Sequence, residues 1–301
     1  MIEAILAGAV RGGSSILFAA LGETVSEKAG VINLSTEGSM LVGALSAYAV
    51  AVETGNAWMG VLAGAAAGAT LAALFAAMVV WRGANQLATG IVVLFLALGV
   101  TALLGRDYVG VGVEGFDRWA VPLLSDIPFV GTILFDQDPL TYLALLAAPA
   151  VWFLLNRTRP GLLVRAAGER GEVLFAAGHS PRLVRFSAVA FGGMLAGIGG
   201  AQLSIALALN WSENMVAGRG FVAVALVIFA GWNPIGALVG ALFFGGVESL
   251  QLQLQAQGVS LPADLLNALP YLATLAVLVV LSRRRLHAAP EGLSRVFEIS
   301  R

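Results

Sequence analysis

Apolar stretches long enough to cross a lipid bilayer recur along almost the whole chain, and this pattern excludes most folds. Of the 301 residues, 58% are hydrophobic and only 12% are charged. Soluble domains carry about 25% charged residues, so a soluble fold of this composition would leave a large apolar surface in water. We therefore predict an all-α polytopic membrane protein with one transmembrane domain over residues 1–301.

The apolar stretches predict roughly nine transmembrane segments, with eight or ten as alternatives, because a helical crossing needs about 20 apolar residues. The expected segments are 2–21, 31–52, 57–81, 86–104, 139–156, 184–208, 220–232, 234–255 and 263–282. The first segment begins with Glu3 and contains Arg11, a pattern that is not typical of a signal peptide. We expect it to be retained.

Charged residues between the segments predict the orientation of the chain. The loop at 157–185 holds six of the sixteen arginines, and the tail at 283–301 begins with three more. Loops rich in arginine collect on the cytoplasmic side of membranes. The loop at 105–138 carries six acidic residues against two arginines and is expected outside. This arrangement predicts an N-terminus outside and a C-terminus in the cytoplasm.

The arginine-rich loop at 157–185 is expected to contain two short helices. Pro160 suits the first turn of a helix, and a second helix would run near residues 169–177. Gly178 suits the left-handed conformation that ends a helix. Ser180-Pro181 then suits the cap and first turn of the next transmembrane helix.

The second of these short helices would present Val173, Leu174 and Phe175 to the cytoplasm. An exposed apolar patch of this kind marks a contact with another protein, or else a helix that lies on the lipid surface. The only lysine, Lys28, lies outside any phosphate-binding loop, and the pattern GxxxxGK[ST] is absent from the sequence. If ATP drives this protein, a partner chain must bind it.

Polar residues stand where a simple membrane anchor would stay apolar. Asn33 and Glu37 lie near the start of the second segment, and Asn85 and Gln86 open the fourth. Two interpretations are open: caps of helices at the membrane interface, or broken helices whose starts line a substrate path. Glu248, deep in the eighth segment, indicates either a hydrogen bond between helices or a polar cavity.

The sequence offers no constellation for chemistry. It contains no cysteine, and its only histidines, His179 and His287, are far apart. No catalytic Ser/His pair or paired carboxylates are apparent, so we expect no catalytic residue, metal or cofactor. A net charge of −1 gives no indication of a nucleic-acid partner.

Short motifs of small and polar residues follow one another through most of the chain. They are Ala20-Leu21-Gly22-Glu23, Glu27, Gly30-Val31-Ile32-Asn33-Leu34, Glu37-Gly38, Asn85-Gln86, Gly90, Gly168-Glu169, Ala177-Gly178, Gly197 to Ala201, Gly218-Arg219-Gly220-Phe221, Trp232-Asn233-Pro234, Gly236, Gly240, Gly245, Leu269-Pro270-Tyr271 and Thr274-Leu275. In this order they resemble the permease subunits of bacterial ABC importers of the ribose and branched-chain amino acid group, most closely those of nucleoside type. Where that family often has Asp-Ala-Leu-Gln, this chain has Glu248-Ser249-Leu250-Gln251, which keeps the acid.

The resemblance implies a multi-pass permease of the bacterial inner membrane that works with partner proteins. The expected partners are ABC ATPase subunits, a second homologous permease and an extracytoplasmic substrate-binding protein. The resemblance also implies that the second short helix docks on the ATPase. We expect this coupling element to contain Glu169, Val173, Phe175, Gly178 and Pro181.

The predicted function is uptake of nucleosides by alternating access. The candidate residues of the substrate path are Asn33, Glu37, Asn85, Gln86 and Asn233. One alternative is the same machine with ribose-like sugars or branched-chain amino acids as substrate. Another class is a secondary transporter that protons drive through Glu37 or Glu248. An intramembrane enzyme has no support in the sequence.

Overall fold

The protein is a bundle of long helices, as the composition predicts. The computed structural model describes residues 2–258, 262–282 and 289–293. Within these residues six helices are long and apolar enough to cross a membrane. They are α1 (Ile2–Lys28), α3 with its continuation η1 (Ala57–Ala76, Ala77–Trp81), α4 (Gln86–Leu104), α6 (Pro139–Arg157), α9 with its continuation η3 (Pro181–Gln202, Leu203–Ala208) and α11 (Pro234–Ala256).

Three further helices belong to the bundle besides these six. They are α2 (Thr36–Thr54), α10 (Arg219–Phe229) and α12 (Ala263–Ser282). The remaining elements are short: η2 (Arg106–Tyr108), β1 (Trp119–Ala120), α5 (Val130–Leu134), β2 (Asp136–Gln137), α7 (Arg159–Glu169) and α8 (Gly171–Ala176). The all-α class of polytopic membrane protein is therefore confirmed.

Helix α1 continues to Lys28, beyond the segment that we expected to end at residue 21. Four polar residues of its last turns are buried within the protein and do not end the helix: Glu23, Thr24, Ser26 and Glu27. Thr24 Oγ1 donates to Ala20 O at 2.7 Å, and Trp232 Nε1 donates to Glu27 Oε2 at 2.5 Å. Protein partners satisfy groups that would otherwise require water.

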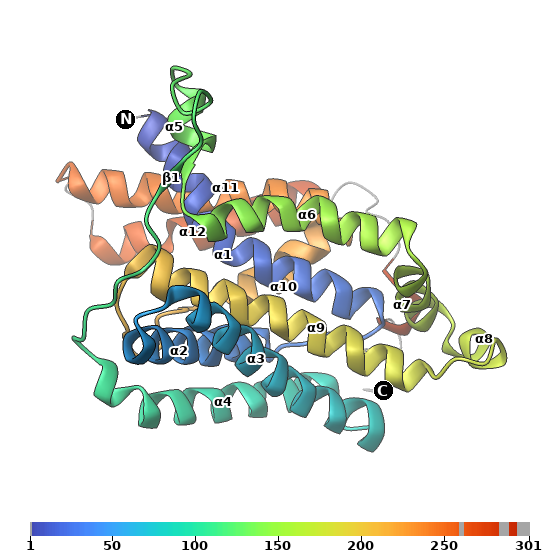
Figure 1. Cartoon of the computed structure of the whole chain (residues 1–301). Helices are drawn as coiled ribbons and strands as arrows, with labels where there is room; N and C mark the ends of the chain where they lie inside the picture. The colour runs from blue at the N-terminus through green and yellow to red at the C-terminus, as the bar shows by residue number, and fades with distance from the viewer. Residues whose placement is uncertain (1, 259–261, 283–288, 294–301) are drawn as a thin grey trace.

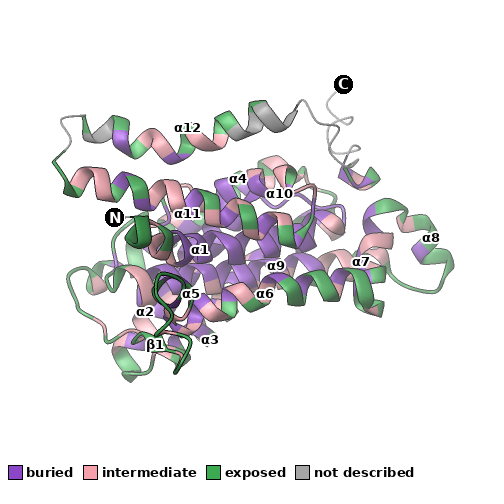
Figure 2. Cartoon of the chain, turned by 90° about the horizontal axis from the view of Figure 1, so that it is seen from above, coloured by how far each residue is buried: buried purple, intermediate pink, exposed green. Residues whose placement is uncertain are grey.

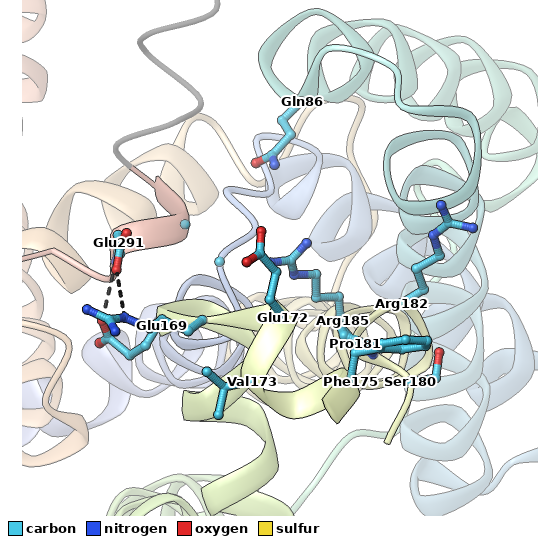
Figure 3. A pocket seen from close by; sticks show the side chains of 14 residues that line it. Gln86, Glu169, Glu172, Val173, Phe175, Ser180, Pro181, Arg182, Arg185 and Glu291 are labelled. Carbon is cyan, nitrogen blue, oxygen red and sulfur yellow. Dashed lines mark hydrogen bonds and ion pairs between the residues drawn. The ribbon is translucent and has the colours of Figure 1, made fainter. Parts of the chain in front are cut away.

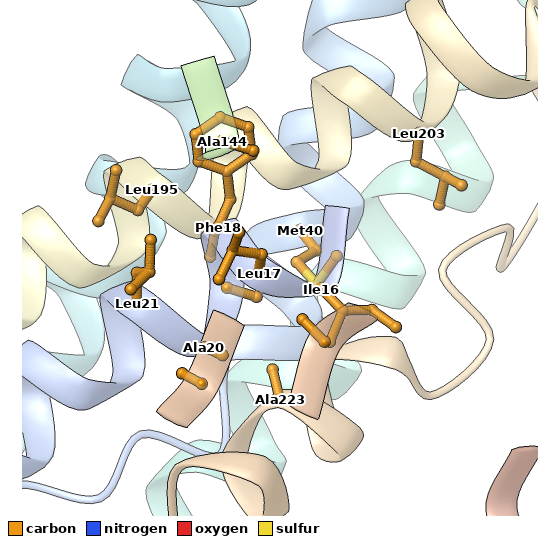
Figure 4. Close-up of a cluster of buried hydrophobic side chains, with 14 of the residues drawn as sticks. Ile16, Leu17, Phe18, Ala20, Leu21, Met40, Ala144, Leu195, Leu203 and Ala223 are labelled. Atoms are coloured by element: carbon orange, nitrogen blue, oxygen red, sulfur yellow. The ribbon is translucent and has the colours of Figure 1, made fainter. Parts of the chain in front are cut away.

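The core of the bundle lies around α1, α2 and α9, which are rich in buried residues (Figure 2). Glycines allow α1 and α2 to approach α9 closely: a side chain at Gly22 of α1 would clash with the backbone of Gly192, and one at Gly43 of α2 with Gly197. Larger side chains such as Phe18 fill the space between, as Figure 4 shows. Packing through small residues is typical of membrane helices.

The two long loops lie at opposite ends of the bundle (Figure 1). At one end, which we call the α8 end, α7 and α8 follow α6. At the other, the α5 end, residues 105–138 contain η2, α5 and the antiparallel pair β1–β2, with Trp119 opposite Gln137. There Tyr108 donates a hydrogen bond to Glu53 Oε1 at 2.5 Å, and this bond raises the pKa of the Tyr108 hydroxyl.

Candidate functional site

The arginine-rich loop folds as its sequence predicts. Pro160 lies in the first turn of α7, and Arg170 separates α7 from α8. Gly178 has a φ of 83°, which is the left-handed conformation expected after a helix. The Ser180 side chain then caps α9, with Pro181 as the first helical residue. Local signals alone therefore fix this element.

Helix α8 exposes two apolar side chains and buries the one between them. Leu174 is 3% exposed, whereas Val173 is 60% and Phe175 is 74% exposed. The helix projects from the α8 end of the bundle (Figure 2). A buried anchor beneath two exposed apolar residues is the arrangement expected of a docking surface.

Arg185 of α9 ties the base of this element to the rest of the bundle. Its Nη2 donates to Ala167 O of α7 at 2.8 Å, and its Nε donates to Ala29 O at 3.2 Å. Gly168 and Gly30 also lie against each other, without room for a side chain at Gly168. Movement of α7 and α8 would therefore reach the turn between α1 and α2. No pattern in the sequence predicts these contacts of Arg185.

A short piece of the predicted tail packs on the same element. Glu291 Oε2 lies 3.6 Å from Arg170 Nε, and the Glu291 N–H lies 3.5 Å from Glu169 Oε2 (Figure 3). Leu293 is buried beside them. The rest of the tail, residues 283–288 and 294–301, lies outside the described residues.

A cleft of about 1050 Å³ lies between α8, the start of α9 and the turn that follows α1 (Figure 3). Four residues of the expected coupling element line it: Glu169, Val173, Phe175 and Pro181. Gln86, an expected path residue, lies in the same cleft, and its Oε1 accepts the Ile32 N–H at 2.9 Å. The structure thus brings one of the five expected path residues to the expected coupling element.

Two other path candidates are caps of helices. Asn85 Oδ1 accepts the Ala88 N–H at 3.0 Å, at the start of α4. Asn233 Oδ1 accepts the Ile235 N–H at 3.0 Å, at the start of α11. These bonds fit the capping interpretation of both residues.

The remaining candidates, Asn33 and Glu37, are buried within the protein at a break in the helical backbone. The Asn33 N–H donates to Glu23 Oε1 at 2.7 Å, just before α2 begins. The two oxygens of Glu37 accept the N–H groups of Gly218 at 2.7 Å and Gly220 at 2.6 Å. Glu37 therefore satisfies the first turn of α10, and a negative charge there is favourable.

Comparisons with known proteins agree with this architecture. The chain belongs to the family of branched-chain amino acid transport system permease components, whose pattern matches residues 5–280. It is thus a multi-pass permease subunit. No solved structure was found to match it.

Three relatives cover most of the chain. A putative glucose ABC transporter permease protein of Haloferax volcanii is 40% identical over 91% of this chain and 90% of the relative. A nucleoside ABC transporter permease protein of Lactococcus lactis is 31% identical over 98% of this chain and 97% of the relative. A guanosine ABC transporter permease protein of Bacillus subtilis is 34% identical over 79% of this chain and 78% of the relative.

Proposed function

We propose that this permease takes up nucleosides by alternating access, driven by ATP that partner subunits hydrolyse. Two relatives that are named as nucleoside or guanosine permeases support the substrate class. The exposed pair Val173 and Phe175 on α8 carries the proposal of an ATPase partner. The sequence itself contains no phosphate-binding loop.

The coupling step follows from how α8 is held. We expect an ATPase that binds Val173 and Phe175 to move α8 together with α7. Leu174 is the buried residue of α8, and Arg185 holds α7 through its hydrogen bond to Ala167 O. Arg185 also binds Ala29, so the motion would reach the turn that joins α1 to α2. A displacement at the α8 end would thereby change the packing of the central helices.

The proposed orientation has nine transmembrane segments, with the N-terminus outside and the C-terminus in the cytoplasm of a bacterial inner membrane. The arginine-rich loop 157–185 and the acidic loop 105–138 support it, because they lie at opposite ends of the bundle. In this orientation a substrate-binding protein would deliver substrate at the α5 end. A second homologous permease would complete the path, most simply as a heterodimer.

Among the expected path residues, Gln86 has the most support because it lines the cleft beside α8. Asn85 and Asn233 bind helix ends, and Glu37 binds the first turn of α10. We propose that Gln86 lies on the exit side of the path. The other four candidates would support the backbone around the path without contacting the substrate: Asn33, Glu37, Asn85 and Asn233.

A second candidate substrate is a hexose, which the relative named as a putative glucose permease favours. Nucleosides and hexoses share a ring that carries neighbouring hydroxyl groups. Affinities of the cognate binding protein for guanosine, glucose and leucine would decide between them. A proton-coupled transporter would instead work in proteoliposomes with an imposed proton gradient and without ATP.

Charge on the exposed face of α8 tests the ATPase partner. Val173→Glu and Phe175→Glu should abolish uptake and transport-linked ATP hydrolysis while the chain still accumulates in the membrane. Leu123→Glu is the matched control, because Leu123 is also apolar and even more exposed but lies in the loop at the α5 end. Normal uptake by both α8 variants would overturn the proposed coupling.

A further inference from the structure

A second polar space lies away from α8, where α1, η3, α10 and α11 meet. It is a cavity of about 520 Å³, within the range of sites for small molecules. Its polar lining comprises Arg11, Asn210, Ser212, Arg219, Glu248 and Ser249. None of these residues belongs to the expected substrate path, because they are scattered through the sequence and only the fold brings them together.

Glu248 of α11 and Arg219 of α10 form an ion pair in this cavity. Arg219 also donates through Nη1 to Met215 O at 3.3 Å and to Val216 O at 3.4 Å. Both side chains are mostly buried, with 15% of Arg219 and 19% of Glu248 exposed. The pair therefore fixes the first turn of α10 against α11.

Among the residues that the structure describes, the ion pair leaves one polar atom of Glu248 and one of Arg219 without a hydrogen-bond partner. Within the described part of the chain, Glu248 Oε2 and Arg219 Nε are buried without a hydrogen-bond partner, and so is Arg11 Nε. Buried polar atoms are normally bonded, because loss of water without a replacement is unfavourable. Three such atoms around one cavity indicate a ligand that offers both donors and acceptors.

Gly12 of α1 leaves space beside Glu248. A side chain at Gly12 would begin 3.7 Å from Glu248 Oε2 and 4.0 Å from Gly245 Cα, which is ordinary contact. Gly22 in the core, in contrast, lies directly against a neighbouring backbone, and so does Gly245, which also lines the cavity. Gly12 therefore accepts a side chain where these two positions do not.

We propose that this cavity is a substrate subsite that binds the neighbouring hydroxyl groups of a neutral sugar ring. Glu248 Oε2 accepts from one hydroxyl, and Arg11 donates to a hydroxyl or ring oxygen. A hydroxyl group is both donor and acceptor, so it can pair with the unpaired acceptor of Glu248 and with an unpaired arginine donor. The subsite rests on the proposed uptake function, and either the ribose of a nucleoside or a hexose supplies this chemistry.

Because the chain has no cysteine, single introduced cysteines can report on the cavity without background from this subunit. Ser212→Cys places a thiol in the lining, and Thr54→Cys places one at the far end of α2, outside the cavity. Membranes that contain the transporter with its partner subunits are treated with a methanethiosulfonate reagent. Labelling rates are compared with and without saturating guanosine, glucose or leucine.

Guanosine or glucose should slow labelling of Ser212→Cys about tenfold, as expected for a site that is mostly occupied. Leucine should not slow it, and none of the three should affect Thr54→Cys. Protection by guanosine alone assigns the ribose of a nucleoside, and protection by glucose assigns a hexose. Equal labelling rates under all conditions, or protection by leucine alone, would overturn the subsite.

Glu248→Gln in the Ser212→Cys background should remove the protection, because the amide provides a weaker acceptor and also a donor. Glu213→Gln makes the same change on a neighbouring exposed residue that does not line the cavity, and it should keep the protection. Size-exclusion profiles of both variants in detergent confirm that they fold. Retained protection in a folded Glu248→Gln variant contradicts the role of Glu248.

Uptake by the Ser212→Cys parent separates the two proposals. If the parent takes up guanosine or glucose but the transported compound gives no protection, the subsite is wrong and the importer stands. If the parent takes up leucine and neither of the other compounds, the nucleoside and hexose assignments both fail with the subsite.

Discussion

Two acidic residues contact the first turn of α10, and they differ in what their oxygens do. Glu37 accepts N–H groups from Gly218 and Gly220 with its two oxygens, and it is 4% exposed. Glu248 pairs with Arg219 through Oε1, while its Oε2 is buried without a partner in the described part of the chain, and the residue lines a cavity. Both oxygens of Glu37 therefore have hydrogen-bond partners within the protein, whereas only one oxygen of Glu248 has a partner among the described residues.

This difference separates structural from functional carboxylates in a membrane protein. An acid inside a span is unfavourable unless protein or water satisfies it, so satisfied acids are parts of the architecture. An acid with a spare oxygen at a cavity can bind a ligand without any change in the fold. The two carboxylates should therefore respond differently to the same substitution.

The largest expected effect is loss of stability when Glu37 is replaced. Glu37→Ala leaves the N–H groups of Gly218 and Gly220 without an acceptor, at a cost of about 3 kcal/mol or more for two charge-assisted bonds. The Tm of the purified chain in detergent should fall clearly, and less folded protein should be recovered. A wild-type Tm for Glu37→Ala would remove the basis of the comparison.

Replacement of Glu248 should affect transport more than folding. Glu248→Gln should reduce uptake per folded chain about tenfold, the effect of one lost charge-assisted hydrogen bond. Its Tm should fall less than that of Glu37→Ala, because the glutamine keeps an oxygen that can accept from Arg219, whereas Glu37→Ala leaves two N–H groups without an acceptor.

The double variant Arg219→Gln/Glu248→Gln sharpens this result. Removal of both charges leaves no unpaired ion, so it should restore the Tm of Glu248→Gln toward wild type. Uptake should stay low, because the spare acceptor is still missing. If uptake recovers together with Tm, Glu248 acts only through the ion pair.

A smaller effect on uptake is expected when a glycine at the cavity, Gly12, is replaced, and a glycine in the core, Gly22, provides the comparison. Gly12→Val fills part of the cavity and should lower uptake severalfold at nearly unchanged Tm, since the new Cβ would lie in ordinary contact, 3.7 Å from Glu248 Oε2, without a clash against backbone. Gly22→Val is the matched change in the core, where the side chain would meet the backbone of Gly192 and destabilise the bundle. Equal losses of Tm in both variants would contradict the distinction.

The smallest effect concerns a third carboxylate, Glu291, at the α8 end. Its ion pair with Arg170 is half exposed and 3.6 Å long, and such pairs contribute less than about 1 kcal/mol. Glu291→Gln should change uptake by less than about twofold, and added salt should reduce that difference further. Uptake assays at low and high salt would check this.

The sequence predicted the α8 end more completely than the region around α10. Pro160, Gly178 and Ser180-Pro181 are local signals, so the two short helices follow from the residues themselves. The overall class follows from composition in the same way. The expectation that the coupling residues lie together also agrees with the cleft beside α8.

The end of α1, the lining of the cavity and the roles of the polar residues depend on contacts between distant parts of the chain. A single sequence does not reveal such contacts. The end of α1 was predicted too early because Glu27 Oε2 accepts a hydrogen bond from Trp232, which lies far along the chain. A polar cavity was one of two interpretations of Glu248, but its other lining residues could not be predicted, since Arg11, Asn210 and Glu248 come from separate elements. Capping residues such as Asn85 and path residues look alike until their hydrogen bonds are known.

The most direct test of the proposed role of Glu248 compares substrates that differ by one hydroxyl group. Uptake of guanosine and deoxyguanosine is measured at saturating concentration, with glucose and deoxyglucose as the second pair, for the wild type and Glu248→Gln. We predict that the wild type transports the hydroxylated compound of one pair faster, and that Glu248→Gln transports both compounds of that pair at the same low rate. A folded Glu248→Gln variant that keeps the wild-type ratio would contradict the account.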